Sequence, residues 1–506
     1  MEKYTLKEKT KLFRRIYIVA ASVMLAFVLA TFVCATADHE NTKLEAKGFS
    51  DSALLFDGNE RTYTRANASS TVTSYRDGGV YSLYIVFDRI PSVWTLTDIT
   101  TGKSVTCGEN AFLHEFVDAE KLFGYAPKQL QMTFSAGTSI SEIYAFGAGE
   151  VPSWVQRWEE PLERADLLLI SSHSDDEQLF FAGVLPYYAG ELGYDVQVVY
   201  VVSHFDTHER PHEQLDGLWA VGVTNYPIIS DIPDLYSESF DGAIATYKNQ
   251  GVSYEAFTDY ITECIRRFKP LVVVSHDING EYGHGTHLVV NRAIRDYLEN
   301  AESADYFAES ANQFGTWMPK KTYFHLYAEN QIVMNWDVPL EAFGGKTAFE
   351  VTQDGFKCHK SQHWTWFNRW IYGTSDAHVK KATDITSYSP CLYGLYQTSV
   401  GYDEVGGDFF ENVKTYAVLE YEEKIRAEEE SRLEAESIEA ARREEESRIE
   451  SESLAEIERE TDNEIPEPQI DNTLDIGLIF IGIVVAGIVL SAVIIAFSSK
   501  NYGRKR

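Results

Sequence analysis

The sequence is poor in cysteine and in positive charge. Its 506 residues contain only 5 Cys and no Cys-x-x-Cys pair, which excludes a disulfide-built scaffold and a paired-cysteine zinc site. Lys and Arg number 44 against 77 Asp and Glu, a net charge of −33 that argues against a nucleic-acid binder, because such proteins need basic surface. Hydrophobic residues make up 44% of the chain, enough to build sizeable cores. At roughly 150 residues per domain, the length predicts about three folded units.

Two long uncharged runs lie near the ends of the chain. Residues 16–37 follow a basic segment, residues 476–497 precede another, and each run is long enough to cross a bilayer. We expect residues 1–37 to be a cleaved signal peptide or a retained N-terminal anchor. Residues 476–497 are predicted to be a transmembrane helix, with 498–506 as a cytoplasmic basic tail. These runs predict a cell-membrane protein, single-pass after signal cleavage, whose central part lies on the extracytoplasmic face.

Residues 416–462 are dominated by charged side chains. The block 428–432 recurs as 444–448, and pairs such as Glu428 and Arg432 have the Glu-first i,i+4 order that supports a helix. The apolar residues are spaced too irregularly for a heptad seam. We therefore predict a single charged helical stalk, with a coiled coil as the alternative.

Residues 38–152 have the pattern of an all-β domain. Short β-rich runs such as 81–87 alternate with Gly, Asp and Asn turns, which predicts a β-sandwich. Residues 56–59 with Thr62, and the closing run 143–149, resemble discoidin-like (galactose-binding-like) modules. The resemblance implies glycan binding, and a role as a spacer or packing domain stays open beside it.

Residues 160–400 alternate strand-like and helix-like segments. Apolar runs at 166–171, 196–202 and 271–275 are each followed by a loop and a helical pattern, which indicates a Rossmann-like α/β parallel sheet. Ligands of such sheets bind at the carboxyl ends of the strands. Polar clusters at 172–177 and 276–287 follow the first and third of these strands, so we expect both clusters at the site.

The two clusters contain residues suited to a metal ion. His173 and Asp176 lie three apart at a strand-to-helix turn, while His284 and His287 share one face of a helix. A set of two His and one Asp leaves an open position for water, as in catalytic zinc sites. The remaining Asp175 suits a general base. A helix cap or a chance His-x-x-His would explain each cluster alone, but their joint placement favours a metal site.

The clusters also resemble two motifs of one enzyme family. Ser-His-Ser-Asp-Asp-Glu at 172–177 is similar to the Ala-His-Pro-Asp-Asp-Glu motif of the PIG-L/LmbE metal-dependent N-deacetylases, and residues 282–287 resemble that family's Tyr-Gly-His-x-x-His. The resemblance implies that one Zn²⁺ ion is bound by His173, Asp176 and His287. It further implies three catalytic groups and one substrate-binding residue: Asp175 as proton acceptor, His284 as oxyanion stabiliser, Tyr282 as partner of the substrate carbonyl or amine, and Arg210 as substrate ligand.

The sequence departs from the family pattern in two places. Ser172 and Ser174 replace Ala and Pro, and residues 203–208 stand where the family has Thr-x-Gly, which leaves the substrate open. The implied reaction is hydrolysis of the acetamide of an N-acetylglucosaminyl-type sugar or glycoconjugate by a membrane-tethered, extracytoplasmic zinc enzyme. The expected partners are an N-acetylated glycan and the membrane, with no nucleic acid. The alternatives are another metal-dependent amide hydrolase on glycoconjugates and a non-catalytic glycan-binding surface protein.

Four further groups of residues each allow two interpretations. His204, His208 and His212 form a second metal face or a loop edge. Asp277 and Asn279 support the histidines that follow them or form a turn. Trp364, Trp366 and Trp370 line a sugar cleft or pack in a core, with core packing preferred. A bridge between Cys358 and Cys391 would fit an extracytoplasmic domain, but no spacing rule supports it.

Overall fold

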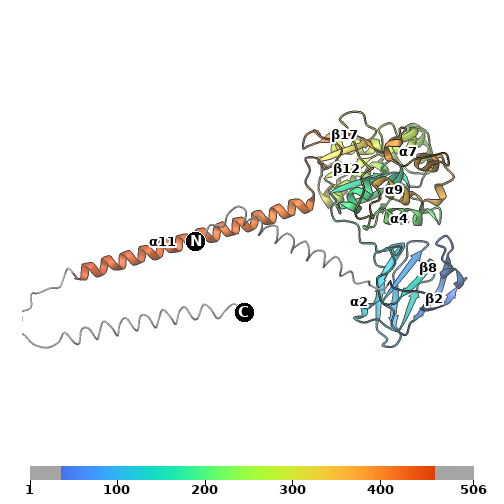
Figure 1. Cartoon of the computed structure of the whole chain (residues 1–506), viewed down its shortest axis with the longest axis horizontal. Helices are drawn as coiled ribbons and strands as arrows, with labels where there is room; N and C mark the ends of the chain where they lie inside the picture. The colour runs from blue at the N-terminus through green and yellow to red at the C-terminus, as the bar shows by residue number, and fades with distance from the viewer. Residues whose placement is uncertain (1–35, 462–506) are drawn as a thin grey trace, which may run out of the picture. The chain divides into compact units, whose positions relative to one another are not determined.

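The structure is a computed structural model that describes residues 36–461. It divides into two compact units, one ending at Glu420 and one beginning at Tyr421. Within its described residues, the first unit contains an N-terminal sheet of eight strands and a second sheet of seven strands (Figure 1). The chain is therefore multidomain, as predicted.

The N-terminal sheet is antiparallel throughout. Its strands are β1 (Lys43–Phe49), β2 (Thr64–Tyr75), β3 (Ser82–Phe87), β4 (Trp94–Asp98), β5 (Ser104–Cys107), β6 (His114–Asp118), β7 (Gln129–Phe134) and β8 (Ser139–Phe146), with the short helices η1 (Ser52–Leu55) and α2 (Ala119–Phe123). The strand order is β5-β4-β7-β2-β8-β3-β6, and β1 pairs with β2.

Strand β2 joins two groups of strands. Its first residues pair with β8 and its last six with β7, and between them Ser69 has a φ of 62°, which bends the strand. Alternate residues of β7 are buried, as expected for a sheet with one covered face. All of β3 is buried, because Tyr84 and Val86 on its outer face pack against Phe146 and Val155.

The second sheet has the order β11-β10-β9-β12-β13-β17-β14. These strands are β9 (Leu167–Ser171), β10 (Val196–Tyr200), β11 (Ile228–Ile229), β12 (Val272–Ser275), β13 (Lys321–His325), β14 (Gln331–Val333) and β17 (Leu392–Thr398). The first five in space are parallel, and β17 and β14 are antiparallel additions at one edge. The order runs outward from β9 in both directions. The chain therefore changes direction across the sheet between β9 and β12, which is the position where such folds bind ligands.

Helices cover both faces of this sheet. They are α3 (Asp176–Leu179), η2 (Pro186–Glu191), α4 (Arg210–Ala220), α5 (Phe240–Asn249), α6 (Tyr254–Phe268), η3 (Glu281–Gly283), α7 (Gly285–Asn300), α8 (Ala308–Phe314), α9 (Ala348–Phe356), η4 (Lys360–Gln362), α10 (Trp366–Tyr372) and η5 (Ala382–Asp384), with a small hairpin of β15 (Gly373–Thr374) and β16 (Ala377–His378). Helices α5, α6 and α7 share one apolar core with the sheet, and α3, α4 and α9 share the core on its other face.

Helix α6 illustrates how the sequence produces these elements. The Ser253 hydroxyl accepts a hydrogen bond from Ala256 N–H and caps the first turn. Phe257, Ile261, Ile265 and Phe268 recur every three or four residues, and all four are buried against the sheet. The helix then ends at a residue in the left-handed conformation.

The charged helix predicted for residues 416–462 corresponds to α11 (Tyr416–Thr461), which has 46 residues. Its described side chains beyond residue 420 are exposed on every face, and several are joined by ion pairs such as Arg443–Glu439 at 2.6 Å. Such pairs between positions three or four apart support a helix that has no apolar face to bury.

The predicted single-pass membrane localisation is contradicted. Over residues 36–461, no helix is both long enough and apolar enough to cross a bilayer. The longest, α11, is excluded by its charge. Of the apolar runs on which the prediction depended, residues 16–35 and all of 476–497 lie outside the described residues. The bridge considered between Cys358 and Cys391 is also absent, since both cysteines are free thiols.

Candidate functional site

The first loop of the site follows β9. The chain turns sharply after Ser171, and Asp175 adopts a φ of 129°, which side chains rarely allow. This turn lets Asp175 N–H donate to Glu177 Oε2 at 2.9 Å, and α3 begins at the next residue. His173 N–H donates to Asp176 Oδ2 at 2.9 Å, so the loop itself fixes the Asp176 carboxylate. Backbone strain of this kind is characteristic of functional sites.

The second loop follows β12 and leads into α7. Gly280 and Tyr282 both have positive φ values, 64° and 48°, which reverse the chain and turn Glu281 into the interior. His284 then caps α7, because its Nδ1 accepts from Thr286 N–H at 3.3 Å. His287, in the first turn of α7, is fully buried.

Atoms of three predicted ligands form a small triangle. His173 Nδ1 lies 3.0 Å from Asp176 Oδ2 and 3.1 Å from His287 Nε2, and the last two atoms are 3.3 Å apart. Atoms about 2.1 Å from a tetrahedral zinc ion are about 3.4 Å from one another. Two imidazoles and one carboxylate at this spacing therefore fit a single zinc ion. Two overlapping groups, His173 with His284 and His287, and Asp176 with His276 and His287, also bring possible ligand atoms within 4.8 Å of one another.

Glu281 organises the imidazoles behind this triangle. Its Oε2 lies 2.6 Å from His287 Nδ1 and 2.9 Å from His276 Nδ1, while its Oε1 lies 2.8 Å from His325 Nδ1. Ser172 N–H donates to His276 Nε2, so the Nδ1 hydrogen of His276 points to Glu281. His287 likewise donates from Nδ1, which leaves Nε2 as its metal-facing nitrogen. Carboxylates that orient metal-binding histidines in this way also raise their basicity.

The electrostatics of the triangle favour a bound cation. Burial would raise the pKa of Asp176, but the charges of His287 and His173 hold it well below its usual value. Burial opposes charge on His173 and His287, yet neighbouring carboxylates raise their pKa values to about 10 and about 9. For His173 the largest of these effects comes from Asp234. The carboxylates that hold protons on these ligands would equally stabilise a divalent ion in their place.

Asp175 and His284 lie beside the triangle, and their pKa values are shifted in opposite directions. Burial raises the pKa of Asp175 to about 7, and Arg210, 3.9 Å from its Oδ1, partly opposes that rise. Burial and the charge of His173 lower the pKa of His284 to about 2, so its imidazole stays neutral. The rings of His284 and His173 are 4.6 Å apart. One group can accept a proton near neutral pH, and the other can donate a neutral hydrogen bond.

The remaining predicted residues reach the same region. Arg210, at the start of α4, donates to Ser174 O at 2.5 Å. The Tyr282 ring lies 5.6 Å from that of His284 and 5.9 Å from that of His287, and burial strongly raises the pKa of its hydroxyl. All seven predicted site residues therefore lie near the carboxyl ends of β9 and β12.

Several residues at the site were missed from the sequence. These are Asp234, whose Oδ1 is 3.3 Å from His173 Nε2, and the three residues His276, Glu281 and His325 described above. His276 directly follows β12, so its place at the carboxyl end of a strand could have been predicted from the sequence. Asp234 follows β11, a strand of only two residues that the sequence pattern does not indicate. The second metal face, the less favoured interpretation of His204, His208 and His212, is not formed by these three described residues, since His204 contacts the site while His208 and His212 contact the N-terminal domain.

Aromatic side chains continue from the site to the surface. Tyr236 lies 5.2 Å from the His284 ring, and Trp366 lies 5.7 Å from the Tyr282 ring. They are 64% and 46% exposed, and Trp364 is 85% exposed. Core packing, the preferred interpretation of Trp364 and Trp366, is therefore wrong for these two side chains.

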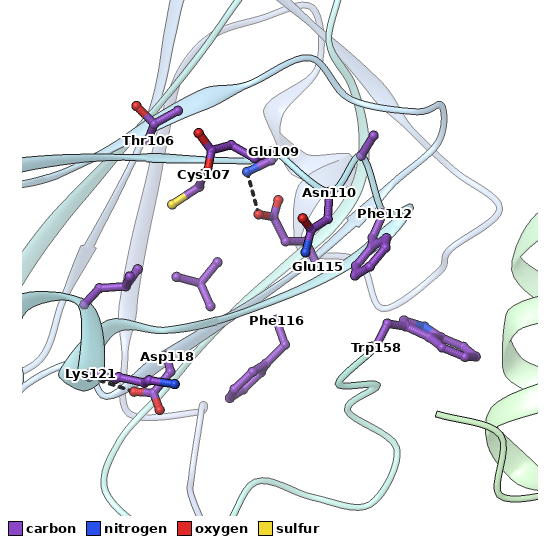
Figure 2. A pocket seen from close by; sticks show the side chains of 14 residues that line it. Thr106, Cys107, Glu109, Asn110, Phe112, Glu115, Phe116, Asp118, Lys121 and Trp158 are labelled. Carbon is purple, nitrogen blue, oxygen red and sulfur yellow. Dashed lines mark hydrogen bonds between the residues drawn. The ribbon is translucent and has the colours of Figure 1, made fainter. Parts of the chain in front are cut away.

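A separate cavity of about 330 Å³ lies on the N-terminal domain and is reached by Trp158 (Figure 2). Two of its three acidic side chains accept hydrogen bonds within the protein: Glu115 from Trp94 Nε1 and from Gly108 N–H, both at 2.7 Å, and Asp118 from Lys121 N–H. The cavity contains no grouping of metal ligands like that at the ends of β9 and β12.

Comparison with known proteins agrees with the site. Residues 168–298 match the family model described as PIG-L: GlcNAc-PI de-N-acetylase. None of the curated proteins compared with the chain matches it. This stretch contains both loops, β12, all of β9 except Leu167, and all seven predicted residues that the fold brings together, Arg210 included.

The chain is similar to three solved structures from different organisms. A conserved protein of Thermus thermophilus is 16% identical, covers 40% of this chain and 81% of its own, and has a TM-score of 0.28. The N,N'-diacetylchitobiose deacetylase of Pyrococcus horikoshii is 14% identical over 46% and 84%, with a TM-score of 0.32. The F5/8 type C domain of a Bacteroides fragilis protein is 10% identical over 22% and 97%, with a TM-score of 0.18. At these scores the likenesses carry no argument about function.

The family match defines the class of this part of the chain: residues 168–298 are a PIG-L family domain. The chain is accordingly an enzyme, a deacetylase that hydrolyses amide bonds.

Proposed function

We propose that the chain is a zinc-dependent deacetylase that removes the acetyl group from an N-acetylglucosaminyl-type sugar or glycoconjugate. The observation that carries the proposal is the triangle of His173 Nδ1, Asp176 Oδ2 and His287 Nε2, with sides of 3.0, 3.1 and 3.3 Å. A zinc ion there would supply Lewis-acid polarisation of the acetamide carbonyl and of a water molecule.

The side chains around the triangle then have distinct roles. Asp175 accepts the proton of the attacking water, since burial brings its pKa near neutrality. His284 donates from Nε2 to the developing oxyanion, because Thr286 N–H occupies Nδ1 and the ring stays neutral. Tyr282 hydrogen-bonds the substrate carbonyl or helps protonate the leaving amine. Arg210 holds the substrate from the side of Ser174.

Three features support a sugar substrate. The description of the matching family model names an N-acetylglucosaminyl compound. The exposed rings of Tyr236 and Trp366 flank His284 and Tyr282, where the apolar face of a sugar ring could pack on them. Residues 38–152, which we propose to be a discoidin-like β-sandwich, carry the turn 56–59 and the closing run 143–149 of glycan-binding modules.

The test combines acetate release with metal analysis. Purified protein is loaded with zinc and incubated with a panel of N-acetylated amino sugars and chitooligosaccharides. We expect Asp175→Ala to bind zinc and to lose about 10²–10⁴-fold in kcat, since that is what a positioned general base contributes. We expect His173→Ala and His287→Ala to lose stoichiometric zinc. Asp376→Ala and His378→Ala, at exposed positions of the β15–β16 hairpin region, are the matched controls.

Two outcomes would overturn parts of the proposal. Equal acetate release by wild type and Asp175→Ala would remove the assigned base. Retention of zinc by Asp176→Ala together with its loss in His284→Ala would favour the alternative set of His173, His284 and His287 as ligands.

A further inference from the structure

The loop between β10 and α4 carries two residues of the site. His204 Nε2 accepts from Ser174 N–H at 3.2 Å, and its Nδ1 lies 3.6 Å from Asp234 Oδ2. At the far end of the loop, Arg210 donates to Ser174 O. The loop therefore contacts both backbone groups of the residue that precedes Asp175. Ser203 forms an isolated bridge to Pro233, but residues 204–209 belong to no helix or strand.

The N-terminal domain supplies the contacts that hold this loop. Arg89, just after β3, donates to the backbone carbonyls of Phe205 and Thr207. The His208 ring donates from Nδ1 to Oδ1 of the buried Asp88 at 2.5 Å. The same ring stacks on Tyr63, with centroids 4.5 Å apart and planes inclined by 29°. Three side chains of the N-terminal domain thus contact Phe205, Thr207 and His208 of the loop.

Helix α4 is held from the same side. His212 Nδ1 lies 2.8 Å from His114 Nε2, and both rings are buried. Arg61 forms an ion pair with Glu213 at 3.2 Å, and Glu213 also accepts from Ser361 N–H at 2.8 Å. The third and fourth residues of α4, His212 and Glu213, therefore contact the N-terminal domain within one turn of Arg210.

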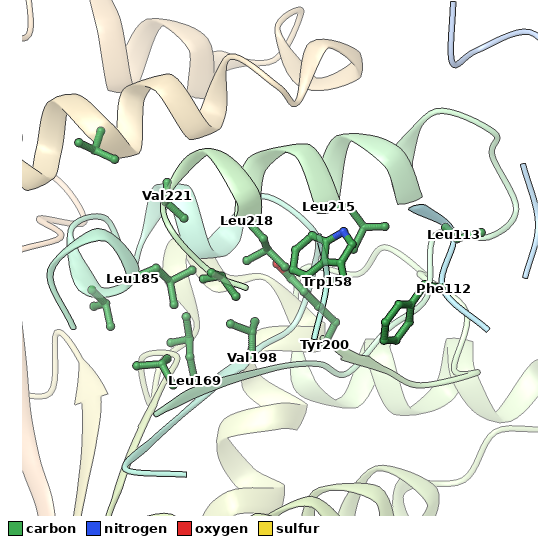
Figure 3. Packing of buried hydrophobic residues seen from close by; sticks show 14 of the residues in the cluster. Phe112, Leu113, Trp158, Leu169, Leu185, Val198, Tyr200, Leu215, Leu218 and Val221 are labelled. Carbon is green, nitrogen blue, oxygen red and sulfur yellow. The ribbon is translucent and has the colours of Figure 1, made fainter. Parts of the chain in front are cut away.

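The two domains also share an apolar core. Phe112 stacks on Tyr226 with centroids 4.4 Å apart, and Tyr226 meets Trp158 edge-on at 5.6 Å. Figure 3 shows Phe112, Trp158 and Leu215 of α4 in one continuous cluster. Direct packing of this kind differs from a flexible tether, in which few contacts cross the boundary.

We infer that the N-terminal domain contributes to the active site by positioning the loop 203–210. Asp88 and Arg89 are the positioning residues for this loop and, through it, for Arg210. The domain fixes the substrate-binding wall of the α/β domain. This goes beyond the proposed function, although it rests on that function for its activity readout. Glycan binding by the N-terminal domain is not needed for this role.

The experiment compares Arg89→Ala with a matched arginine. Arg76 also makes a set of side-chain hydrogen bonds, to Asp38 and Thr42, but all lie within the N-terminal domain. We expect Arg89→Ala to retain zinc, to lower kcat/KM about 10-fold through KM, and to speed amide hydrogen exchange in residues 203–210 about 10-fold. We expect Arg76→Ala to leave both quantities within about 2-fold of wild type. Tyr63→Leu, which removes the stacking on His208 and the contact of Arg65 with the same ring, is the milder second variant if Arg89→Ala does not fold.

A double-mutant cycle with Arg210→Ala tests the route. If Arg89 acts through Arg210, the combined variant should lose little more than Arg210→Ala alone, because the interaction is already absent. The inference would be overturned if residues 203–210 exchanged at the wild-type rate in both Arg89→Ala and Tyr63→Leu. It would also be overturned if Arg89→Ala and Arg76→Ala lowered kcat/KM equally. Absence of acetate release by wild type would refute the proposed function instead, while the exchange measurement would still decide the role of Arg89.

Discussion

Replacing Glu281 by glutamine tests how one buried carboxylate organises the metal-binding face. Glu281 is fully buried and meets four donors: Oε2 faces His276 and His287, and Oε1 faces His325 and Asp277 N–H at 3.1 Å. Glutamine has nearly the same shape, but one of its two ends is an NH₂ group that cannot accept. With its oxygen facing His276 and His287, the glutamine leaves Asp277 N–H without an acceptor. His325 keeps a partner on each nitrogen, because its Nε2 can donate to Ser389 O at 3.0 Å while its Nδ1 accepts from the NH₂ group.

The size of the effect follows from that count. A buried donor left without a partner costs about 1–3 kcal/mol, so the unpaired Asp277 N–H predicts a loss of that size in the unfolding free energy of the metal-free protein. The loss of a carboxylate behind a metal-binding histidine typically weakens metal binding about 10–100-fold. We therefore expect Glu281→Gln to raise the zinc Kd by about that factor, since the carboxylate no longer orients His287.

The assays are zinc titration against a competing chelator and urea unfolding of the metal-free protein. Glu115→Gln is the matched control, because Glu115 is a half-buried carboxylate that accepts two hydrogen bonds far along the chain from the site. It should lose stability without any change in zinc affinity. If Glu281→Gln binds zinc as tightly as wild type and unfolds at the same urea concentration, the role assigned to Glu281 is refuted.

Two further predictions concern protons. The pKa values of His173 and His287, about 10 and about 9 without metal, predict that zinc binding at pH 7.5 releases about two protons per ion. An indicator dye in weak buffer measures this release, and the absence of any release would refute the prediction. Burial chiefly raises the pKa of Glu142 from 4.5 to about 7, so the folded state loses stability as the pH rises through that window. Glu142→Gln should therefore gain roughly 1–2 kcal/mol over wild type between pH 4.5 and pH 8, after allowance for solvent screening, and equal urea midpoints at both pH values would contradict it.

Much of the α/β domain was predictable because its central strands are short, continuous apolar runs. Residues 166–171, 196–202 and 271–275 correspond closely to β9, β10 and β12. The edge strands β14 and β17 pair antiparallel across a long segment, which local pattern does not reveal. The membrane prediction was wrong because it depended on end segments alone.

The site shows a similar limit. The sequence predicted that His173 and His287 would meet, since both follow strands whose carboxyl ends lie at one edge of the sheet. It assigned the supporting role to Asp277 and Asn279, whereas Glu281 faces the imidazoles. Which side chain of that loop turns inward depends on the positive φ values at Gly280 and Tyr282, and residue pattern does not encode those angles.

The order of strands has a consequence for how the protein would bind the proposed zinc ion. Ser172 and His276 are 104 positions apart in the chain, and His173 and His287 are 114 apart, yet each pair is in direct contact. Neither half of the ligand set can bind zinc as the complete site does until β9 and β12 have paired, and pairing across such separations is slow. Zinc would therefore bind after the sheet has formed, unlike the ion of a zinc finger, which drives folding. Once bound, the zinc ion would stabilise the folded sheet, and the sheet would unfold more slowly as the zinc concentration rises.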